Sequence, residues 1–349
     1  MSERCSSKRS VSERSARLEA SVVGRLAPSP TGAQHLGNAR TFLLVWWLAR
    51  RANGILFLRI EDLDTPRIKP WATAQVIEDL SWLGVDWDKS PPQQGSAVES
   101  PFWLQSDRLA RYAEAMEQLK RCEAIYPCTC TRSDFESAQS APHEDRANSD
   151  LDGTVYPGTC SSRGVEDASR LDETGKKYAW RFRMPDGPQN WVDQFAGSQD
   201  LPDLKSSLGD FVIGRSNGAP AYQIAVVVDD HDMAVNQIAR GSDLIYSTYR
   251  QLAIHKRLGW DPPSYYHFPL VVGPDGKRLA KRHGDTRLSF YREQGVSPEQ
   301  LIGFLAYHSG WIENLESVSA KDLLTIDILS KQIRDATVVS DNSLMISER

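Results

Sequence analysis

The chain has 349 residues, a formal net charge of -5, and 40% hydrophobic and 25% charged residues. This composition is ordinary for a globular protein, and the length allows about two or three compact units. No apolar run reaches the roughly 18 residues that a membrane-spanning helix needs, so membrane insertion is not expected. The negative net charge gives no general attraction for nucleic acid, so any RNA contact must use a local basic surface.

The N-terminal segment, residues 1–20, is rich in Ser and Arg and lacks the apolar stretch of a signal peptide. We therefore expect a disordered tail and a cytoplasmic protein. The five cysteines are an odd number, which argues against a disulfide framework and leaves metal binding or simple burial as their roles.

The first elements form a strand, helix, strand unit. Residues 21–27 are a mostly apolar run that ends before Pro28, residues 38–52 carry large apolar side chains at helical spacing, and residues 55–60 are a second apolar run. Three such elements within about 40 residues predict a parallel βαβ unit. The expected fold class is therefore α/β, with a doubly wound parallel sheet of the Rossmann type.

Later elements are predicted from the same patterns. Helices are expected over residues 71–83, 106–122 (with Ser106 as the N-cap), 247–258 and 299–311, and strand character over residues 177–184 and 221–228. Residues 131–174 are polar and predict a loop-rich insertion. The expected units are a catalytic domain in two halves (21–115 and 177–260), an insertion (116–176), a basic loop with a helical subdomain (261–313) and a C-terminal extension (314–349).

Residues 28–38 follow the first strand, where doubly wound sheets bind their ligands. Gly32 and Gly37 would let a nucleotide approach the backbone, and the helix start after Gly37 is expected to offer free amides to phosphate oxygens. His35 could donate a hydrogen bond to a phosphate as charge develops there. No Gly-x-x-x-x-Gly-Lys motif occurs, so a P-loop is not indicated.

A second motif is the basic stretch from Lys277 to Gly284, which follows a Gly273-Pro-Asp-Gly276 turn. Nucleotidyl transfer needs cations that neutralise phosphate charge, and Lys281 is the first candidate for that role. A solvated loop without a ligand is the alternative interpretation of the same residues.

The two motifs resemble the signatures of the glutamyl-tRNA synthetase family of class I enzymes. The resemblance extends from Gly24 to Trp311 and includes Leu58-Arg-Ile-Glu-Asp-Leu-Asp64, Leu83-Gly-Val-Asp-Trp87, Gln105-Ser-Asp-Arg108, Tyr222 with Val226–His231, and Arg240-Gly-Ser-Asp243. It implies His35 and Lys281 as catalytic residues. It implies that glutamate is bound by Arg25, Leu26, Ala27, Pro28, Ser29, Glu61, Tyr222 and Arg240. It implies that ATP, accompanied by Mg²⁺, is bound by Pro28, Gly32, His35, Gly37, Asn38, Arg278, Leu279, Ala280, Lys281 and Arg282.

Charge complementarity agrees with this glutamate site. Free glutamate has two carboxylates and one ammonium, and Arg25, Arg240 and Glu61 offer the opposite charges, with Tyr222 as a hydrogen-bond donor. Which arginine meets which carboxylate stays open, and either arginine alone could instead belong to a structural ion pair.

Within the family, about 38 residues after Trp311 leave no room for the helical domains that read an anticodon. The chain resembles the shortened glutamyl-queuosine tRNA(Asp) synthetases. That resemblance implies activation of L-glutamate with ATP without tRNA, transfer to the queuosine base of tRNA(Asp), and a monomer that needs no membrane. The alternatives are a glutamyl-tRNA synthetase that charges a tRNA 3′ end and a non-catalytic paralogue that binds RNA or an amino acid.

The same resemblance implies one structural zinc ion in the insertion, with the ligands Cys128, Cys130, Tyr156 and Cys160; His143 or water could stand in for the phenol. Three positions depart from the family pattern. Ala280 replaces a common serine, Asn38 replaces a glycine or a second histidine, and the spacer from Cys130 to Tyr156 is long.

Overall fold

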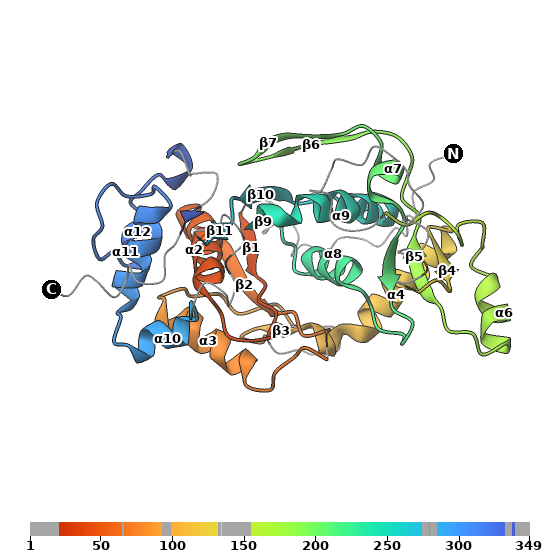
Figure 1. Cartoon of the computed structure of the whole chain (residues 1–349), viewed down its shortest axis with the longest axis horizontal. Helices are drawn as coiled ribbons and strands as arrows, with labels where there is room; N and C mark the ends of the chain where they lie inside the picture. Colours follow the sequence, from red (N-terminus) through yellow and green to blue (C-terminus); the bar gives the residue numbers. More distant parts are fainter. Residues whose placement is uncertain are drawn as a thin grey trace.

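The computed structural model describes residues 21–64, 66–92, 99–131, 134, 155–273, 279, 285–331 and 337–338. A parallel sheet lies at its centre, with β2 paired to β1 on one side and to β3 on the other (Figure 1). β10 pairs in parallel with β9, and β9 lies beside β1, where the Asn236 amide donates to the Val23 carbonyl over 3.1 Å. No helix in the described part of the chain is long and apolar enough to cross a membrane.

The elements of the first part are β1 (Val23–Leu26), α2 (Leu36–Arg51), β2 (Ile55–Ile60), α3 (Ala72–Trp82), β3 (Trp103–Leu104) and α4 (Leu109–Arg121). The middle part contains β4 (Ile125–Cys128), α6 (Asp167–Glu173), β5 (Ala179–Phe182), β6 (Gln189–Asp193), β7 (Gly197–Leu201), α7 (Leu204–Leu208) and β8 (Phe211–Gly214). The last part contains α8 (Tyr222–Asp232), β9 (Gln237–Gly241), α9 (Ile245–Leu258), β10 (Ser264–Phe268), β11 (Val271–Val272), α10 (Leu288–Glu293), α11 (Pro298–His308), α12 (Ala320–Leu323) and β12 (Thr337–Val338). The βαβ unit predicted over residues 21–60 is confirmed.

Side chains alternate along the sheet, so both of its faces are covered. Leu56 and Leu58 pack in the cluster that contains α2, whereas Phe57 between them packs with Met233 and Tyr265 on the other face. A strand with apolar side chains on both faces is what a doubly wound sheet requires. The sheet therefore holds the carboxyl ends of its strands rigidly, which positions the residues that follow them.

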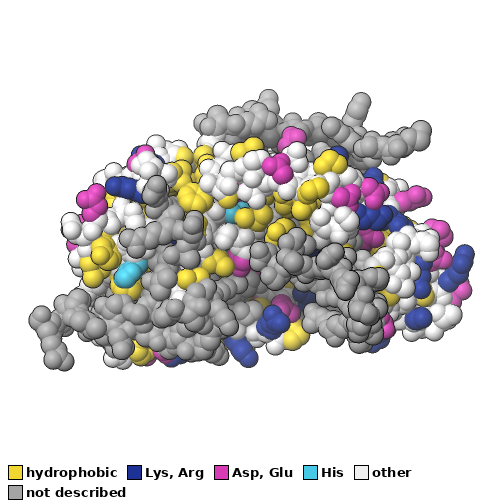
Figure 2. Space-filling view, turned by 45° about the horizontal axis from the view of Figure 1, so that its top comes forward, with side chains coloured by type: hydrophobic (Ala, Val, Ile, Leu, Met, Phe, Trp, Pro, Cys, Tyr) yellow, Lys and Arg dark blue, Asp and Glu magenta, His cyan; other side chains and the backbone are white. Residues whose placement is uncertain are grey.

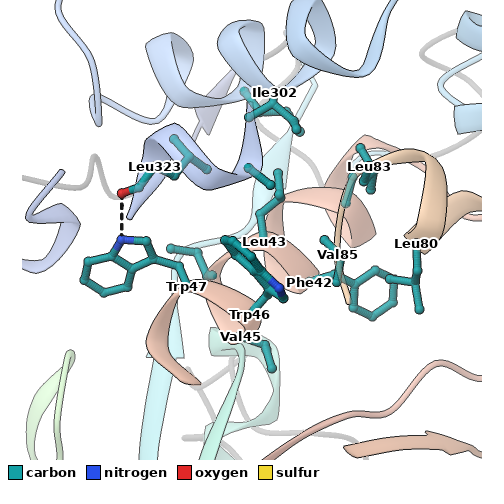
Figure 3. Close-up of a cluster of buried hydrophobic side chains, with 14 of the residues drawn as sticks. Phe42, Leu43, Val45, Trp46, Trp47, Leu80, Leu83, Val85, Ile302 and Leu323 are labelled. Carbon is teal, nitrogen blue, oxygen red and sulfur yellow. Dashed lines mark hydrogen bonds between the residues drawn. The ribbon is translucent and has the colours of Figure 1, made fainter. Parts of the chain in front are cut away.

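Helix α2 is the centre of the largest apolar cluster (Figure 3). Its Trp46 and Trp47 are nearly inaccessible to solvent, and the Trp47 indole N–H donates to the Leu323 carbonyl over 2.9 Å. Ile302 of α11 packs in the same cluster. The helices that follow the basic motif are thus fixed against the helix that follows the first motif.

A second region, which lies on the right in Figure 1, is built on an antiparallel sheet with the order β4-β5-β8. Its apolar cluster joins residues from α4, β5, α8 and α9, including Met116, Phe182, Val228 and Ile254. A separate hairpin, β6-β7, contacts β10 through a hydrogen bond from the Gln194 amide to the Tyr265 carbonyl. The described residues thus form one large apolar cluster around α2, a second one in this region, and the smaller cluster around Phe57 on the other face of the parallel sheet.

Two local predictions are wrong. Residues 221–228 were expected to have strand character, but Tyr222–Asp232 form a helix in which Ile224 to Asp230 are all buried; a helix enclosed on every side reads like a buried strand. Ser106 is not an N-cap, because its amide and hydroxyl bond to the Asp62 carboxylate and the helix begins at Leu109.

Candidate active site

A pocket of about 510 Å³ lies at the carboxyl ends of β1, β2 and β9. The structure brings ten of the predicted site residues to its walls: Ala27, Pro28, Ser29, Gly32, His35, Gly37, Asn38, Glu61, Tyr222 and Arg240. Residues as far apart in the chain as Ala27 and Arg240 both line this pocket, because parallel strands end at the same edge of the sheet.

His35 caps the start of α2. Its Nδ1 accepts a hydrogen bond from the Gly37 amide over 3.1 Å, and the Asn38 side-chain oxygen accepts from the His35 amide over 3.2 Å. Because Nδ1 is an acceptor, a neutral imidazole carries its proton on Nε2, where it can donate. Asn38, which departs from the family pattern, thus has a structural role as one half of a capping box.

The expectation of free amides at this helix start is wrong. The Leu36 amide donates to the Thr286 carbonyl over 3.1 Å, the Gly37 amide donates to His35, and the Asn38 amide donates to the His35 carbonyl. A Cβ added at Gly37 would lie 3.0 Å from the His35 ring, so the absence of a side chain there keeps the imidazole in place. The motif therefore fixes the position of the His35 ring, and the first amides of α2 are engaged within the protein rather than open to an anion.

The Arg240 guanidinium makes three hydrogen bonds through two of its nitrogen atoms, Nε and Nη2. Nε donates to His267 Nε2 over 3.0 Å, and Nη2 donates to the side-chain oxygens of Thr248 (2.7 Å) and Gln251 (2.8 Å). Nη1 is buried and has no hydrogen-bond partner among the described residues. Since Arg240 lines the pocket, this guanidinium has a donor available for an acidic ligand.

His267 and Asp193 support Arg240 on the side of its Nε atom, and neither residue was among the predicted site residues. His267 Nδ1 lies 2.6 Å from Asp193 Oδ2, and both side chains are fully buried. Burial lowers the pKa of His267 despite its bond to Asp193, so the ring is neutral, with Nδ1 donating and Nε2 accepting from Arg240. The two residues lie 74 positions apart, on β6 and β10, so no local pattern could pair them.

A network of buried charges forms the floor below the pocket. Asp230 Oδ1 accepts from Arg25 Nε over 3.1 Å and from Arg59 Nη1 over 2.6 Å. Arg59 Nη2 donates to Glu61 Oε1 over 3.1 Å, and the Glu61 amide donates to the Pro28 carbonyl. Arg25 is therefore engaged through Nε in an ion pair, and it is not among the residues that line the pocket.

The charged groups around the pocket act on one another. Burial raises the pKa of Glu61, and the charges of Arg59 and Arg25 only partly oppose this effect. Burial and then the charge of Glu61 raise the pKa of Tyr222, so its phenol stays protonated and able to donate. A cationic group that entered the pocket would stabilise the charged form of Glu61.

The remaining predicted residues lie elsewhere. The Leu26 side chain is fully buried in the apolar core and does not line the pocket. Leu279 is buried in the same core, and its amide donates over 3.1 Å to the carbonyl of Val271, which does line the pocket. Arg278, Ala280, Lys281 and Arg282 lie outside the described residues.

The three predicted cysteine ligands converge in the second region. The sulfur atoms of Cys128, Cys130 and Cys160 all lie within 4.8 Å of one another. The Tyr156 hydroxyl lies 3.4 Å from the Cys128 sulfur and 3.7 Å from the Cys130 sulfur. Four donor atoms therefore lie close together: one from the end of β4, one from Cys130 just after it, and two from residues 156–160. The alternative ligand His143 lies outside the described residues.

The surroundings of the cysteine cluster are polar. Burial raises the pKa of Cys130 to about 11. Burial also opposes ionisation of Cys160, but hydrogen bonds from the Thr129 backbone and the Tyr156 hydroxyl outweigh it and bring that pKa to about 7. Arg181 Nε donates to the Cys128 sulfur over 3.2 Å, and its guanidinium lies 3.8 Å from the centre of the Tyr156 ring. A cation beside three sulfurs compensates negative charge on them.

Comparison with known proteins identifies the family. Residues 21–345 match the family described as "tRNA synthetases class I (E and Q), catalytic domain". The chain belongs to this family. It is 48% identical over 324 residues to Glutamyl-Q tRNA(Asp) synthetase of Rhodopirellula baltica, a match that covers 91% of this chain and 93% of that protein. Glutamyl-Q tRNA(Asp) synthetase of Symbiobacterium thermophilum is 43% identical, with 90% and 94% covered.

Longer family members match over part of their length. Glutamate-tRNA ligase 2 of Syntrophus aciditrophicus is 36% identical, and the match covers 92% of this chain but 64% of that protein. The crystal structure of a glutamate tRNA ligase from Elizabethkingia meningosepticum superposes with a TM-score of 0.75 at 28% identity, covering 93% and 68% of the two chains. The class I α/β fold with a parallel sheet, predicted from the sequence, is confirmed.

Proposed function

We propose that this protein activates L-glutamate with ATP, without needing tRNA, and transfers it to the queuosine base in the anticodon loop of tRNA(Asp). The observation that carries this proposal is the similarity over nearly the full length of both chains to proteins named Glutamyl-Q tRNA(Asp) synthetase. Glutamate-tRNA ligases match equally far along this chain but extend beyond it. The protein would thus be a ligase of the aminoacyl-tRNA synthetase type.

Glutamate would bind in the pocket between Arg240 and Glu61. The buried Nη1 of Arg240 has no hydrogen-bond partner among the described residues, and a substrate carboxylate would satisfy it. Glu61 would receive the substrate ammonium, and the protonated Tyr222 hydroxyl would donate to the ligand. Arg25 would act from the floor, where its Nε already meets Asp230, with Ala27, Pro28 and Ser29 shaping the wall.

In the first step, a carboxylate oxygen of glutamate would attack the α-phosphorus of ATP, and the bond to the departing pyrophosphate would break. His35 is suited to stabilise charge on the phosphate oxygens, because its Nδ1 is held as an acceptor and Nε2 carries the proton. Lys281 would be the main cation, assisted by Arg278 and Arg282, with Gly32 leaving room for the nucleotide. A Cβ at Gly32 would meet no atom of the described residues beyond its chain neighbours within 4 Å, which leaves space there.

In the second step, a hydroxyl of the queuosine ring would attack the activated carbonyl of glutamyl adenylate and displace AMP. The adenylate phosphate would receive the hydroxyl proton. Mg²⁺ would enter with ATP, coordinated mainly by phosphate oxygens and water.

We also propose one structural zinc ion at the cysteine cluster. A tetrahedral site with Zn–S bonds of about 2.3 Å separates its ligand atoms by about 3.8 Å. The Cys130 and Cys160 sulfurs are 3.5 Å apart, and the Tyr156 hydroxyl is 3.4 Å and 3.7 Å from the sulfurs of Cys128 and Cys130. These spacings and the thiolate-rich donor set fit zinc. Cys128, Cys130, Cys160 and Tyr156 would hold the metal, whose role would be to join β4 to the segment after residue 155.

A labelling experiment tests the proposed function. The protein is incubated with ATP, radiolabelled glutamate and tRNA(Asp) with or without queuosine, and the tRNA 3′ end is blocked by periodate in a parallel sample. We expect label only on queuosine-containing tRNA(Asp), unaffected by periodate. Label on the 3′ end of tRNA(Glu) would instead identify a charging enzyme, and the absence of any adenylate would identify a binding protein.

A further inference from the structure

A second pocket, of about 750 Å³, lies in the other half of the molecule from the sheet that carries the amino-acid pocket, and the two pockets share no lining residue. It lies between α4, the start of β5 and the connection from β8 to α8, in the right-hand half of Figure 1. Pro220 lines this pocket and Tyr222, two residues later, lines the amino-acid pocket. Arg215, in its wall, lies 3.5 Å from Asp64, which follows Glu61 by three residues. Two segments therefore connect the walls of the two pockets: the start of α8 and the ion pair between Arg215 and Asp64.

One wall of this second pocket is aromatic. The rings of Tyr178 and Trp180 meet edge to face, 5.5 Å apart at 87°, and both are only half-buried. Trp180 rests on Gly214, where an added Cβ would lie 3.3 Å from the tryptophan side chain. Lys120 Nζ lies 4.6 Å from the centre of the Trp180 ring. A partly exposed aromatic pair beside a cation is the arrangement on which nucleic-acid bases stack.

The rim of the pocket carries more positive than negative charge. Its lining includes Lys120, Lys176, Lys177 and Arg215 against Glu117 and Asp172. Glu117 is paired to Lys120 at 2.6 Å, and Asp172 accepts from the Tyr178 hydroxyl. Lys176 and Lys177 are exposed and form no ion pair with any described residue. Figure 2 shows basic and acidic side chains together at the right-hand end of the molecule rather than a broad basic face.

We propose that this pocket binds a nucleotide of the single-stranded RNA loop that presents the modified base to the amino-acid pocket. The base stacks against Tyr178 and Trp180, and the phosphates on either side lie near Lys176 and Lys177. This inference rests on the proposed function, because it assumes that the acceptor is a base within a loop. A tRNA 3′ end has nucleotides on one side of the reacting group only, whereas a base within a loop has nucleotides on both sides. The second pocket receives one of these neighbouring nucleotides.

The experiment compares RNA binding with glutamate activation. The first test variant is Trp180→Ala, and its control is Trp71→Ala, which removes an exposed tryptophan outside both pockets. The second is the double variant Lys176→Glu with Lys177→Glu, and its control is Lys256→Glu with Lys321→Glu, which makes the same charge change elsewhere. Binding of a tRNA(Asp) anticodon stem-loop is followed by fluorescence anisotropy. Glutamate-dependent exchange of pyrophosphate into ATP, without RNA, reports activation and folding.

We expect Trp180→Ala to weaken RNA binding about tenfold to a hundredfold and Trp180→Phe to restore most of it, since stacking needs only an aromatic face. The lysine double variant should weaken binding and reduce its dependence on salt, with pyrophosphate exchange unchanged in every variant. RNA binding that is unaffected by both variants, or that falls only together with exchange, would overturn the proposal. If the unaltered protein binds the stem-loop through Trp180 but transfers no glutamate to it, the proposed function fails and the RNA site stands.

Discussion

The floor of the amino-acid pocket and the cysteine cluster are both buried and polar, but they are stabilised differently. In the floor, every charge meets an opposite charge: Arg59 is fully buried and contacts Asp230 and Glu61, and Arg25 contacts Asp230. In the cysteine cluster, the donor atoms mainly meet one another, as with the sulfurs of Cys130 and Cys160 at 3.5 Å.

This difference shows which site is complete before its ligand arrives. Buried charges that are mutually paired and hydrogen-bonded need no further group, so the floor can hold Glu61 ready for a substrate, while His267, Thr248 and Gln251 hold Arg240. In the cysteine cluster the printed cationic contact is the one from Arg181 to the Cys128 sulfur, so a metal ion bound by the sulfurs would add the charge compensation that the floor already has. A preformed amino-acid pocket fits activation without tRNA, and the following variants test whether the two regions respond as this contrast requires.

The largest effect is expected for Arg240→Ala. Loss of the guanidinium that lines the pocket should lower kcat/KM for glutamate in pyrophosphate exchange about a thousandfold, in the range measured when one partner of a desolvated charge pair is removed. His267, Thr248 and Gln251 stay neutral, so the fold should persist, which circular dichroism can check. Arg250→Ala removes another buried arginine outside the pocket and is the control. Equal losses in both variants would contradict a binding role for Arg240.

Arg59→Leu tests the floor itself. The change leaves Asp230 and Glu61 buried without their main cation and should lower the free energy of unfolding by about 3–5 kcal/mol. The control is Arg50→Ala, whose partners Asp86 and Asp88 are 73% and 44% exposed, and it should cost less than about 1 kcal/mol. Urea denaturation of both variants measures the difference, and similar losses would show that the floor is not specially dependent on pairing.

A buried histidine beside the floor should also make the protein sensitive to acid. Burial lowers the pKa of His255 to about 4, and the charge of Asp230 only partly opposes this effect. Because the unfolded chain takes up this proton near pH 6.5 and the folded protein only near pH 4, stability falls as the pH drops through that window, by about 3 kcal/mol. His255→Gln should remove most of this loss. Urea denaturation at pH 7 and pH 4.5 tests it, and an unchanged pH dependence in the variant would contradict the assignment to His255.

The smallest effect on stability is expected at the cysteine cluster. Cys128→Ser should lower bound zinc from about one equivalent to well below that and reduce the melting temperature by about 5 °C, with glutamate activation largely retained. Cys122→Ser changes a thiol outside the cluster and should leave both values unchanged. Elemental analysis and thermal melting provide the measurements. Purified protein that contains no zinc and is indifferent to chelators would remove the metal from this region.

The sequence alone predicted the parts of the site that lie close together in the chain. The βαβ unit and the placement of His35 after the first strand depend on local spacing, and both are found. The support of Arg240 by His267 and Asp193 could not be predicted, because it joins residues from β9, β10 and a separate hairpin. The prediction of strand character for residues 221–228 was wrong, because the buried residues of α8 show no polar face that would mark a helix.

Pyrophosphate exchange in the complete absence of RNA tests the preformed pocket most directly. The protein is incubated with ATP, labelled pyrophosphate and either L-glutamate or L-glutamine. The paired floor, with Glu61 and Arg240 already positioned, predicts rapid exchange with glutamate and little with glutamine. Exchange that begins only after tRNA is added, or that does not distinguish the two amino acids, would contradict a glutamate site that is complete before RNA binds.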